Sequence, residues 1–174
     1  MKIFGLAGWS GSGKTTLLTG IIPELRALGL SVSTIKHAHH AFDVDQPGKD
    51  SYRHREAGAA EVLVTSSQRW ALMHELRGEA EPSLDVLLTR LAPVDVVLVE
   101  GFKRHPHPKL EVWRSAVGHD WMFSTDPTVV AVAADRPPEA AALPYFTLED
   151  HRAIAMFICR HLQIAGKPHG GAQQ

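Results

Sequence analysis

The sequence predicts an α/β fold with a mostly parallel, doubly wound sheet and helices on both of its faces. Strand-like and helix-like segments alternate along the 174 residues, which is typical of parallel sheets with crossover helices. Residues 94–99 and 129–134 form continuous apolar runs, which indicates strands covered on both faces. A glycine-rich loop separates the first predicted strand from the first predicted helix, the arrangement found in P-loop NTPases.

The first half of the chain is predicted to contain short, alternating elements. Residues 2–7 are apolar and strand-like, and residues 14–28 carry apolar side chains at helical spacing. A second strand over residues 31–36 leads into a polar loop, residues 37–50. The elements predicted next are a helix over residues 51–57, a hairpin of strands 61–65 and 69–73, and a helix over residues 83–91.

The second half is predicted to complete the sheet. Its predicted elements are strands at residues 94–99, 110–114 and 129–134, and a helix at residues 148–162. The segment from Thr147 to Asp150 resembles a capping box and is expected to open that helix. Because the sequence shows no linker, we expect one nucleotide-binding domain over residues 1–165. We expect residues 166–174 to be a disordered tail, since they carry no apolar anchor.

Composition argues against several classes of partner. Charged residues make up 21% of the chain and the formal net charge is −1, so no overall field favours nucleic acid or a membrane surface. The single cysteine, Cys159, lies on an apolar helical stripe, which indicates a packing role and a reducing compartment. No signal peptide is expected before the first strand, and no apolar run reaches the length of a membrane span. We therefore expect a cytoplasmic protein.

Residues 8–16, Gly-Trp-Ser-Gly-Ser-Gly-Lys-Thr-Thr, fit the pattern G-x-x-x-x-G-K-[ST] of loops that wrap nucleotide phosphates. The glycines let successive N–H groups point at an anion, and the following helix adds the positive end of its dipole. Lys14 is expected to reach the β- and γ-phosphates, and the Thr15 hydroxyl is expected to bind Mg²⁺. The predicted triphosphate-binding residues are Gly8, Ser10, Gly11, Ser12, Gly13, Lys14, Thr15 and Thr16.

Glu100 ends the most apolar predicted strand, and ligands of doubly wound sheets lie beyond the carboxyl ends of the strands. Glu100 is therefore predicted to hold Mg²⁺ or to orient the attacking water. The alternative is a solvated carboxylate at a strand exit. Asp95 lies at the other end of the same strand, about 17 Å away, and is rejected as the metal residue.

The polar loop at residues 37–50 leaves the second predicted strand at the same edge of the sheet. Asp43 is a candidate to complete the Mg²⁺ shell, and Asp45 is a candidate catalytic residue that senses the γ-phosphate, as switch loops do. The loop also holds His37, His39 and His40. These histidines suggest a zinc or nickel site, but they lack the four-ligand pattern of a structural site. A loop that orders on the nucleotide is the preferred interpretation.

Asp135 directly follows the apolar run at residues 129–134. A carboxylate there can accept hydrogen bonds from N1–H and N2–H₂ of guanine, donors that adenine lacks. A turn residue ahead of Arg136-Pro137-Pro138 is an equally good interpretation. The sequence therefore leaves Asp135 open between a guanine-reading and a structural role.

The stretch Arg104-His105-Pro106-His107-Pro108 is predicted to be a stiff loop, because its prolines lack backbone donors. It follows Glu100 closely, so its histidines can touch a substrate. An exposed loop is nevertheless the default expectation.

Several separate motifs, in one order along the chain, resemble a single known family. They are Lys36-His37-x-His39-His40, Asp43-Val44-Asp45, Pro47-Gly48-Lys49-Asp50-Ser51-Tyr52, Ala57-Gly58-Ala59, Gln68-Arg69-Trp70-Ala71-Leu72-Met73 and Leu98-Val99-Glu100-Gly101-Phe102-Lys103. Together with the phosphate loop they resemble the molybdopterin-guanine dinucleotide biosynthesis protein B (MobB) family. The resemblance is strong over residues 1–115 and holds only in outline beyond them.

The resemblance implies a GTP-binding protein with weak intrinsic GTPase activity, usually a homodimer, that uses GTP and Mg²⁺. Such a protein acts as an accessory to the guanylyltransferase that joins GMP to molybdopterin. On this chain it implies that residues 11–16 hold the nucleotide and that Glu100 lies on the metal side. Asp135 lies beyond the strongly matching part, and residues 105–108 are where the family is expected to vary.

Three other functions stay open. A small-molecule kinase would use the same phosphate loop, but such enzymes carry an arginine-bearing lid that the sequence does not clearly show. A non-catalytic module would bind GTP tightly to organise a dimer and would not turn it over. A metallochaperone GTPase would retain Ni²⁺ or Zn²⁺ on its loop histidines.

Overall fold

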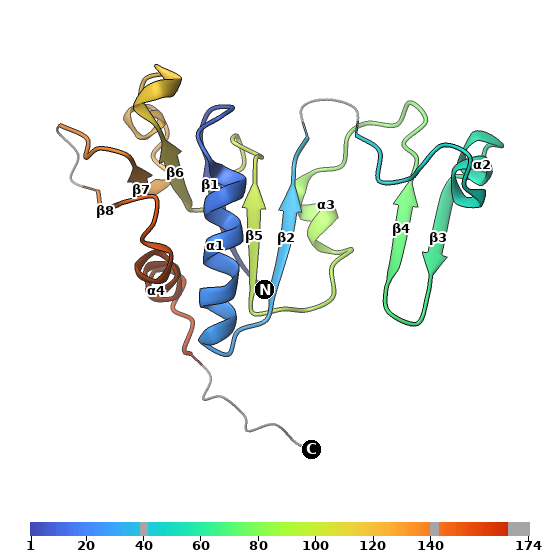
Figure 1. Ribbon diagram of the computed structural model, residues 1–174, viewed down its shortest axis with the longest axis horizontal. Coiled ribbons are helices and arrows are strands. Elements are labelled where there is room, and N and C mark those ends of the chain that lie inside the picture. The colour runs from blue at the N-terminus through green and yellow to red at the C-terminus, as the bar shows by residue number, and fades with distance from the viewer. Residues whose placement is uncertain (39–41, 140–142, 167–174) are drawn as a thin grey trace. The chain divides into compact units, whose positions relative to one another are not determined.

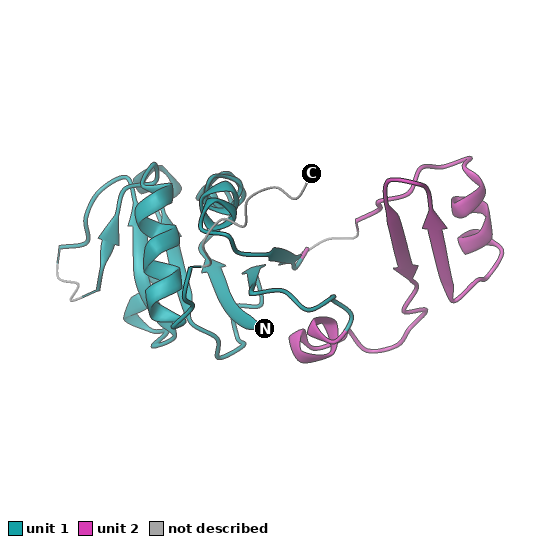
Figure 2. Cartoon of the chain, turned by 90° about the horizontal axis from the view of Figure 1, so that it is seen from below, with its two compact units in different colours: residues 1–37, 90–174 teal, residues 38–89 magenta. Residues whose placement is uncertain are grey.

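The protein is described by a computed structural model over residues 1–38, 42–139 and 143–166, and it forms two compact units (Figure 2). The first unit combines residues 1–37 with the chain from residue 90 onward, and the second spans residues 38–89. The single domain expected over residues 1–165 stays a prediction. Most of the expected disordered tail, residues 167–174, lies outside the described residues.

A six-stranded sheet forms the centre of the first unit (Figure 1). Its strands are β1 (Lys2–Ala7), β2 (Val32–Lys36), β5 (Val96–Glu100), β6 (Lys109–Trp113), β7 (Val129–Ala134) and β8 (Tyr145–Phe146). They lie in the order β2-β5-β1-β6-β7-β8, and every neighbouring pair is parallel. This confirms the predicted α/β fold with a mostly parallel sheet. All of β5 is buried between β2 and β1, as its continuous apolar run indicates.

Helices α1 (Lys14–Ala27) and α4 (His151–His161) pack together and supply the helical side of the core (Figure 1). Phe4 and Leu98 from the sheet meet Ile21 of α1 and Ile158 of α4 in one cluster of fully buried side chains. Cys159 belongs to the same cluster, which confirms its predicted packing role. Burying these apolar side chains stabilises the unit by about 1.5–3 kcal/mol for each large residue.

The start of α4 lies three residues later than predicted, at His151 instead of residue 148. The carboxylate of Asp150 accepts the backbone N–H of Thr147 at 2.9 Å, so residues 147–150 form a turn ahead of the helix. This bond, from a backbone N–H to the side chain three residues later, is one of the two bonds of a capping box, but the regular helix begins only at His151. The predicted capping box therefore contributes a turn and not the first residues of the helix.

The second unit contains the predicted hairpin, in which β3 (Glu61–Thr65) pairs antiparallel with β4 (Trp70–His74). Helix α2 (Asp50–Glu56) contacts β3, and α3 (Leu84–Leu88) begins after Ser83, whose hydroxyl caps it by accepting the N–H of Val86. Within the described residues, no helix has the length and apolar character needed to cross a membrane.

Candidate functional site: a phosphate loop and its surroundings

The loop between β1 and α1 has the backbone that the glycine pattern predicts. Gly13 precedes α1 in the left-handed region, with φ of 95°, where a side chain is costly. At Gly8, φ is 148°, and a Cβ atom would collide with the carbonyl oxygen of Val112 on β6. Among the described side chains, none caps the amino end of α1. Its first N–H groups therefore remain available to an anion.

The ammonium group of Lys14 lies across this loop. Its Nζ donates hydrogen bonds to the carbonyl oxygens of Trp9 at 2.8 Å and Gly8 at 3.1 Å. Burial lowers the pKa of Lys14; the carboxylate of Glu100 opposes that shift, and the charges of Lys103 and Lys36 add to it. Lys14 is thus held at the mouth of the loop as a partly desolvated cation, which strengthens its attraction for phosphate oxygens.

Thr15 and Glu100 lie side by side, although they are 85 residues apart in the sequence. The Thr15 hydroxyl donates to the two carboxylate oxygens of Glu100 at 3.0 and 3.1 Å. This contact forms because β5 is next to β1, so its carboxyl end reaches the start of α1. A hydroxyl and a carboxylate are the oxygen ligands that Mg²⁺ prefers beside phosphate oxygens, so the residues present fit this metal. Thr15 and Glu100 are the groups that would hold it.

Three cationic side chains that the sequence analysis did not assign also reach this loop. Lys36 Nζ, at the end of β2, lies 3.5 Å from the carboxylate of Glu100. Arg114, just after β6, donates from Nε to the carbonyl oxygen of Ser12 at 3.2 Å. Lys103 lies over the indole ring of Trp9, 4.5 Å from the ring centre. All three follow or end a parallel strand at the carboxyl edge, which is the signal that could have located them.

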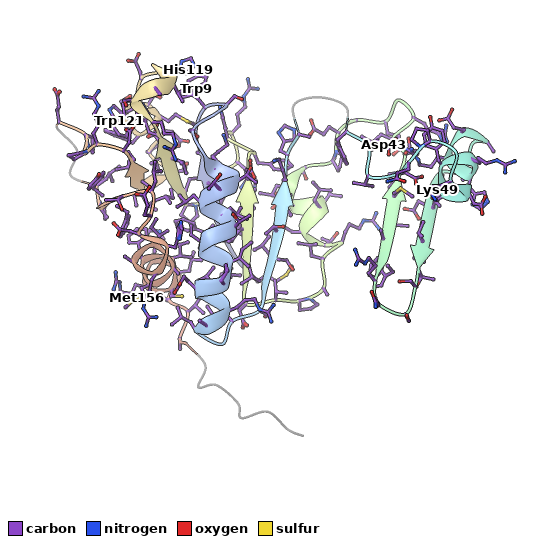
Figure 3. All side chains as sticks on the ribbon, in the orientation of Figure 1. Trp9, Asp43, Lys49, His119, Trp121 and Met156 are labelled. Atoms are coloured by element: carbon purple, nitrogen blue, oxygen red, sulfur yellow. The ribbon has the colours of Figure 1, made fainter. Side chains whose placement is uncertain are left out.

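Trp9, the second residue of the loop, is held between two segments. Its indole ring stacks on His119 with ring centres 4.3 Å apart, and its Nε1 donates to the backbone carbonyl oxygen of Asp120 at 3.4 Å. Figure 3 shows Trp9 and His119 together beside the start of α1. The loop conformation is therefore coupled to the segment after β6.

Three other residues of the predicted loop, Ser10, Ser12 and Thr16, differ in their exposure to solvent. Ser10 lies exposed in the turn, and Thr16 is exposed in the first turn of α1. Ser12 is buried, and its hydroxyl has no hydrogen-bond partner in the described structure. A buried hydroxyl without a partner is costly, so Ser12 Oγ is a group that a phosphate oxygen can satisfy.

Asp135 directly follows β7 and contacts Ser115, the second residue after β6. Its carboxylate oxygens accept the Ser115 N–H at 3.0 and 3.1 Å and the Ser115 hydroxyl at 2.8 Å. Desolvation acts to raise the pKa of Asp135, but the hydrogen bonds from Ser115 outweigh it and hold the pKa below its ordinary value. The geometry gives Asp135 a structural role in joining two strand ends, and its reading of guanine stays a prediction.

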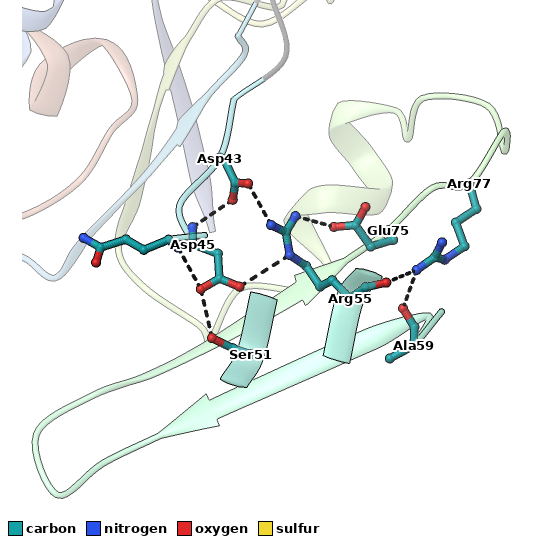
Figure 4. Close-up of polar contacts among 8 residues, drawn as sticks. Asp43, Asp45, Ser51, Arg55, Ala59, Glu75 and Arg77 are labelled. Carbon is teal, nitrogen blue, oxygen red and sulfur yellow. Dashed lines mark hydrogen bonds and ion pairs between the residues drawn. The ribbon is translucent and has the colours of Figure 1, made fainter. Parts of the chain in front are cut away.

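Asp43 and Asp45 belong to the second unit, where both contact the guanidinium group of Arg55 (Figure 4). The distances are 2.7 Å from Nη2 to Asp43 and 3.4 Å from Nε to Asp45, and Glu75 completes the network at 3.0 Å. Asp45 also accepts the hydroxyl of Ser51 at 2.9 Å. In the described structure both carboxylates pair with the half-buried guanidinium of Arg55. Their metal and switch roles stay predictions. His39 and His40 lie outside the described residues.

The proline-rich loop before β6 differs from the expected exposed loop, because His107 is 4% exposed. Gly5 of β1 has no side chain, and a Cβ there would collide with the His107 ring. The ring therefore fills the space over β1. Burial, with added repulsion from Lys109 and His105, lowers the pKa of His107 to about 4. His107 is thus a neutral, structural residue at ordinary pH.

Comparison with known proteins supplies the family. The family described as "Molybdopterin guanine dinucleotide synthesis protein B" matches residues 3–135. The chain is 43% identical over 166 residues to the molybdopterin-guanine dinucleotide biosynthesis adapter protein of Escherichia coli, covering 94% of each chain. It is 45% identical over 141 residues to the protein of the same name from Haemophilus influenzae, covering 80% of this chain and 78% of the other.

Solved structures agree with the sequence comparison. A crystal structure of molybdopterin-guanine biosynthesis protein B aligns with 92% of this chain and 99% of its own, with a TM-score of 0.73 and 27% identity. The Bacillus subtilis MobB structure aligns with 93% and 98%, with a TM-score of 0.72 and 25% identity. The phosphate loop, the parallel sheet and these similarities lead to one conclusion: the chain belongs to the molybdopterin-guanine dinucleotide synthesis protein B family.

Proposed function

We propose that this chain binds GTP with Mg²⁺ through residues 8–16, hydrolyses it slowly, and serves as an adapter in the biosynthesis of molybdopterin guanine dinucleotide. The observation that carries the proposal is the contact between Thr15 and Glu100 beside Lys14. It joins two oxygen groups suited to Mg²⁺ with a cation suited to phosphate. Bound Mg²⁺ would neutralise charge on the phosphates, while Lys14 and the loop N–H groups orient them.

The adapter role is supported by the relatives, which carry the name adapter protein at 43% and 45% identity. Slow turnover suits such a role, because an adapter uses the bound nucleotide to hold a conformation or a partner. The partner we propose is the guanylyltransferase that joins GMP to molybdopterin. A complex detected by size-exclusion chromatography in GTP, and lost in Lys14→Ala, would support this. A complex of equal amount without nucleotide would contradict a GTP-dependent adapter.

Release of phosphate from GTP tests the hydrolytic part of the proposal. Glu100→Gln keeps the size of the side chain but removes its charge, so we expect hydrolysis to fall at least about tenfold. Glu149→Gln, an exposed carboxylate near α4, is the matched control and should hydrolyse GTP at the wild-type rate. Equal rates in both variants would favour a non-catalytic GTP-binding module.

Self-association is the second part of the partner proposal, and the hairpin of the second unit supports it. Leu63 faces Leu72 across the strands, and Thr65 faces Trp70. Leu63 and Trp70 are 59% and 66% exposed, so one face of the hairpin presents large apolar side chains to solvent. A two-stranded hairpin is marginally stable alone, and apolar patches of this kind mark interfaces. We assign this face to a second copy of the chain.

Sedimentation velocity tests the dimer. Trp70→Ser is expected to shift the protein toward monomer at micromolar concentration, because it removes the largest apolar side chain of the face. Met156→Ser, on the exposed side of α4 (Figure 3), is the control and should leave the distribution unchanged. A monomeric wild-type protein, or a Trp70→Ser dimer of undiminished affinity, would contradict the assignment.

A further inference from the structure

We propose that a hollow at the carboxyl edge of the first unit binds a flat, two-ring heterocycle with a 2-amino-4-oxo edge, which is the edge shared by guanine and pterins. The hollow has a volume of about 320 Å³ and is lined by Trp121, Phe123, Arg136, Pro137, Pro138 and Glu139. That volume lies at the lower end for small-molecule sites. It suits a single bicyclic ring and is too small for a whole dinucleotide.

Aromatic side chains make the wall of the hollow and are firmly supported. Trp121 stacks on Trp113 with ring centres 4.3 Å apart and planes 17° from parallel, and Trp121 also contacts Phe123. Trp113 is 5% exposed, and its Nε1 donates to the carbonyl of His119 at 2.8 Å. Flat rings stack well on such indole surfaces.

The segment that carries Trp121 and Phe123 is hydrogen-bonded to strand β6 of the sheet. Glu111 on β6 is fully buried, and its carboxylate accepts the N–H groups of Met122 at 2.7 Å and Phe123 at 2.9 Å. These residues form the short helical turn η2 (Met122–Ser124), which contacts β7. The wall is therefore preorganised, and a ligand does not have to order it.

The polar rim supplies the means of recognition. Among the described residues, the carboxylate of Glu139 makes neither a hydrogen bond nor an ion pair, and it lines the hollow. The guanidinium of Arg136 lies over the Trp113 ring, 5.1 Å from the ring centre, and can attract an anionic substituent. A carboxylate accepts two adjacent donors, N–H and NH₂, from a 2-amino-4-oxo ring, and adenine does not offer that pair. Asp135, in contrast, is already bonded to Ser115.

The hollow lies on the same unit as the phosphate loop and is linked to it by the strand ends. Arg114 contacts Ser12 of the loop, and the next residue, Ser115, is held by Asp135, which directly precedes Arg136. The inference therefore deepens the proposed function and rests on it for the biological source of the ring. Guanine of a nucleotide and the pterin of the cofactor precursor are the two sources.

Calorimetric titration of the full-length protein with guanosine, 6-hydroxymethylpterin and adenosine tests the inference. These probes carry no phosphate, so the loop at residues 8–16 does not hold them. We expect guanosine or the pterin to bind at least tenfold more tightly than adenosine. Glu139→Gln should weaken that binding about 10- to 100-fold, the effect of losing hydrogen bonds to a charged acceptor. Glu149→Gln changes an exposed carboxylate that does not line the hollow; it is the matched control and should bind within about threefold of wild type.

The titrations distinguish the two sources of the ring and can also overturn the inference. Binding of guanosine alone identifies the source as a nucleotide base, and binding of the pterin alone identifies it as a pterin. Absence of binding by both, equal binding of adenosine, or undiminished binding in Glu139→Gln overturns the inference. Lys14→Ala separates this inference from the proposed function, because it should abolish GTP binding while the probes still bind. Tryptophan quenching by the bound probe should diminish in Trp121→Phe.

Discussion

Substitution of Gly8 by alanine tests the geometry of the phosphate loop directly. The residue has φ of 148°, and its new Cβ would meet the carbonyl oxygen of Val112 and lie 2.7 Å from Ser12 Oγ. Backbone strain costs about 1–2 kcal/mol, and displacement of a fixed carbonyl adds about 1–3 kcal/mol. The total, about 2–5 kcal/mol, corresponds to a fall in Tm of about 4–20 °C for a chain of this length.

Gly11→Ala is the matched control for this substitution. Gly11 lies in the same loop with φ of 80°, but within 4 Å its added Cβ would meet no described atom. Gly11→Ala therefore introduces backbone strain but no steric collision, and the unfolding free energy of this variant should fall by only about 1–2 kcal/mol. Thermal unfolding followed by circular dichroism measures both. Equal Tm values for the two variants would refute the close approach of the loop to β6.

Three further predictions concern charged and titrating groups. Lys14→Ala should weaken GTP binding at least about a hundredfold, since it removes charge-assisted bonds to phosphate. The far-UV circular dichroism spectrum should stay unchanged. Retained affinity in calorimetry would contradict the assignment of residues 8–16 to triphosphate binding. Asp135→Asn should reduce the preference for GTP over ATP if Asp135 reads the base, and an unchanged preference would leave it the structural role shown by its bonds to Ser115. Because of His107, the unfolding free energy should fall as the pH decreases from about 6.5 to about 4. In that range the unfolded chain takes up a proton, whereas the buried ring, with its pKa of about 4, does not. Urea titrations across pH should show a smaller fall in His107→Gln.

Much of the first unit was predictable because its signals are local. The apolar run at residues 129–134 matches β7, and the spacing of leucines and isoleucines locates α1. The strand β8 was missed because Tyr145–Phe146 is too short to show a period. Its place in the sheet depends on pairing with β7, which no local pattern records.

The site was predictable where a motif carries a fixed geometry. The loop glycines, Lys14 and Thr15 follow from the pattern itself, and Glu100 follows from its place at a strand end. The contact of Arg114 with the loop depends on β6 lying next to β1. The spacing of apolar residues along the sequence does not indicate the order of the strands in the sheet. Asp43 resembled a ligand because the sequence does not show that Arg55 neutralises it.

Calorimetric titration of GTP and ATP, each with Mg²⁺, tests the proposed nucleotide preference, and phosphate release is followed in the same samples. We expect a clear preference for GTP and slow release of phosphate. Equal affinity for both nucleotides, or a preference for ATP, would contradict this expectation and favour a small-molecule kinase that uses the same loop.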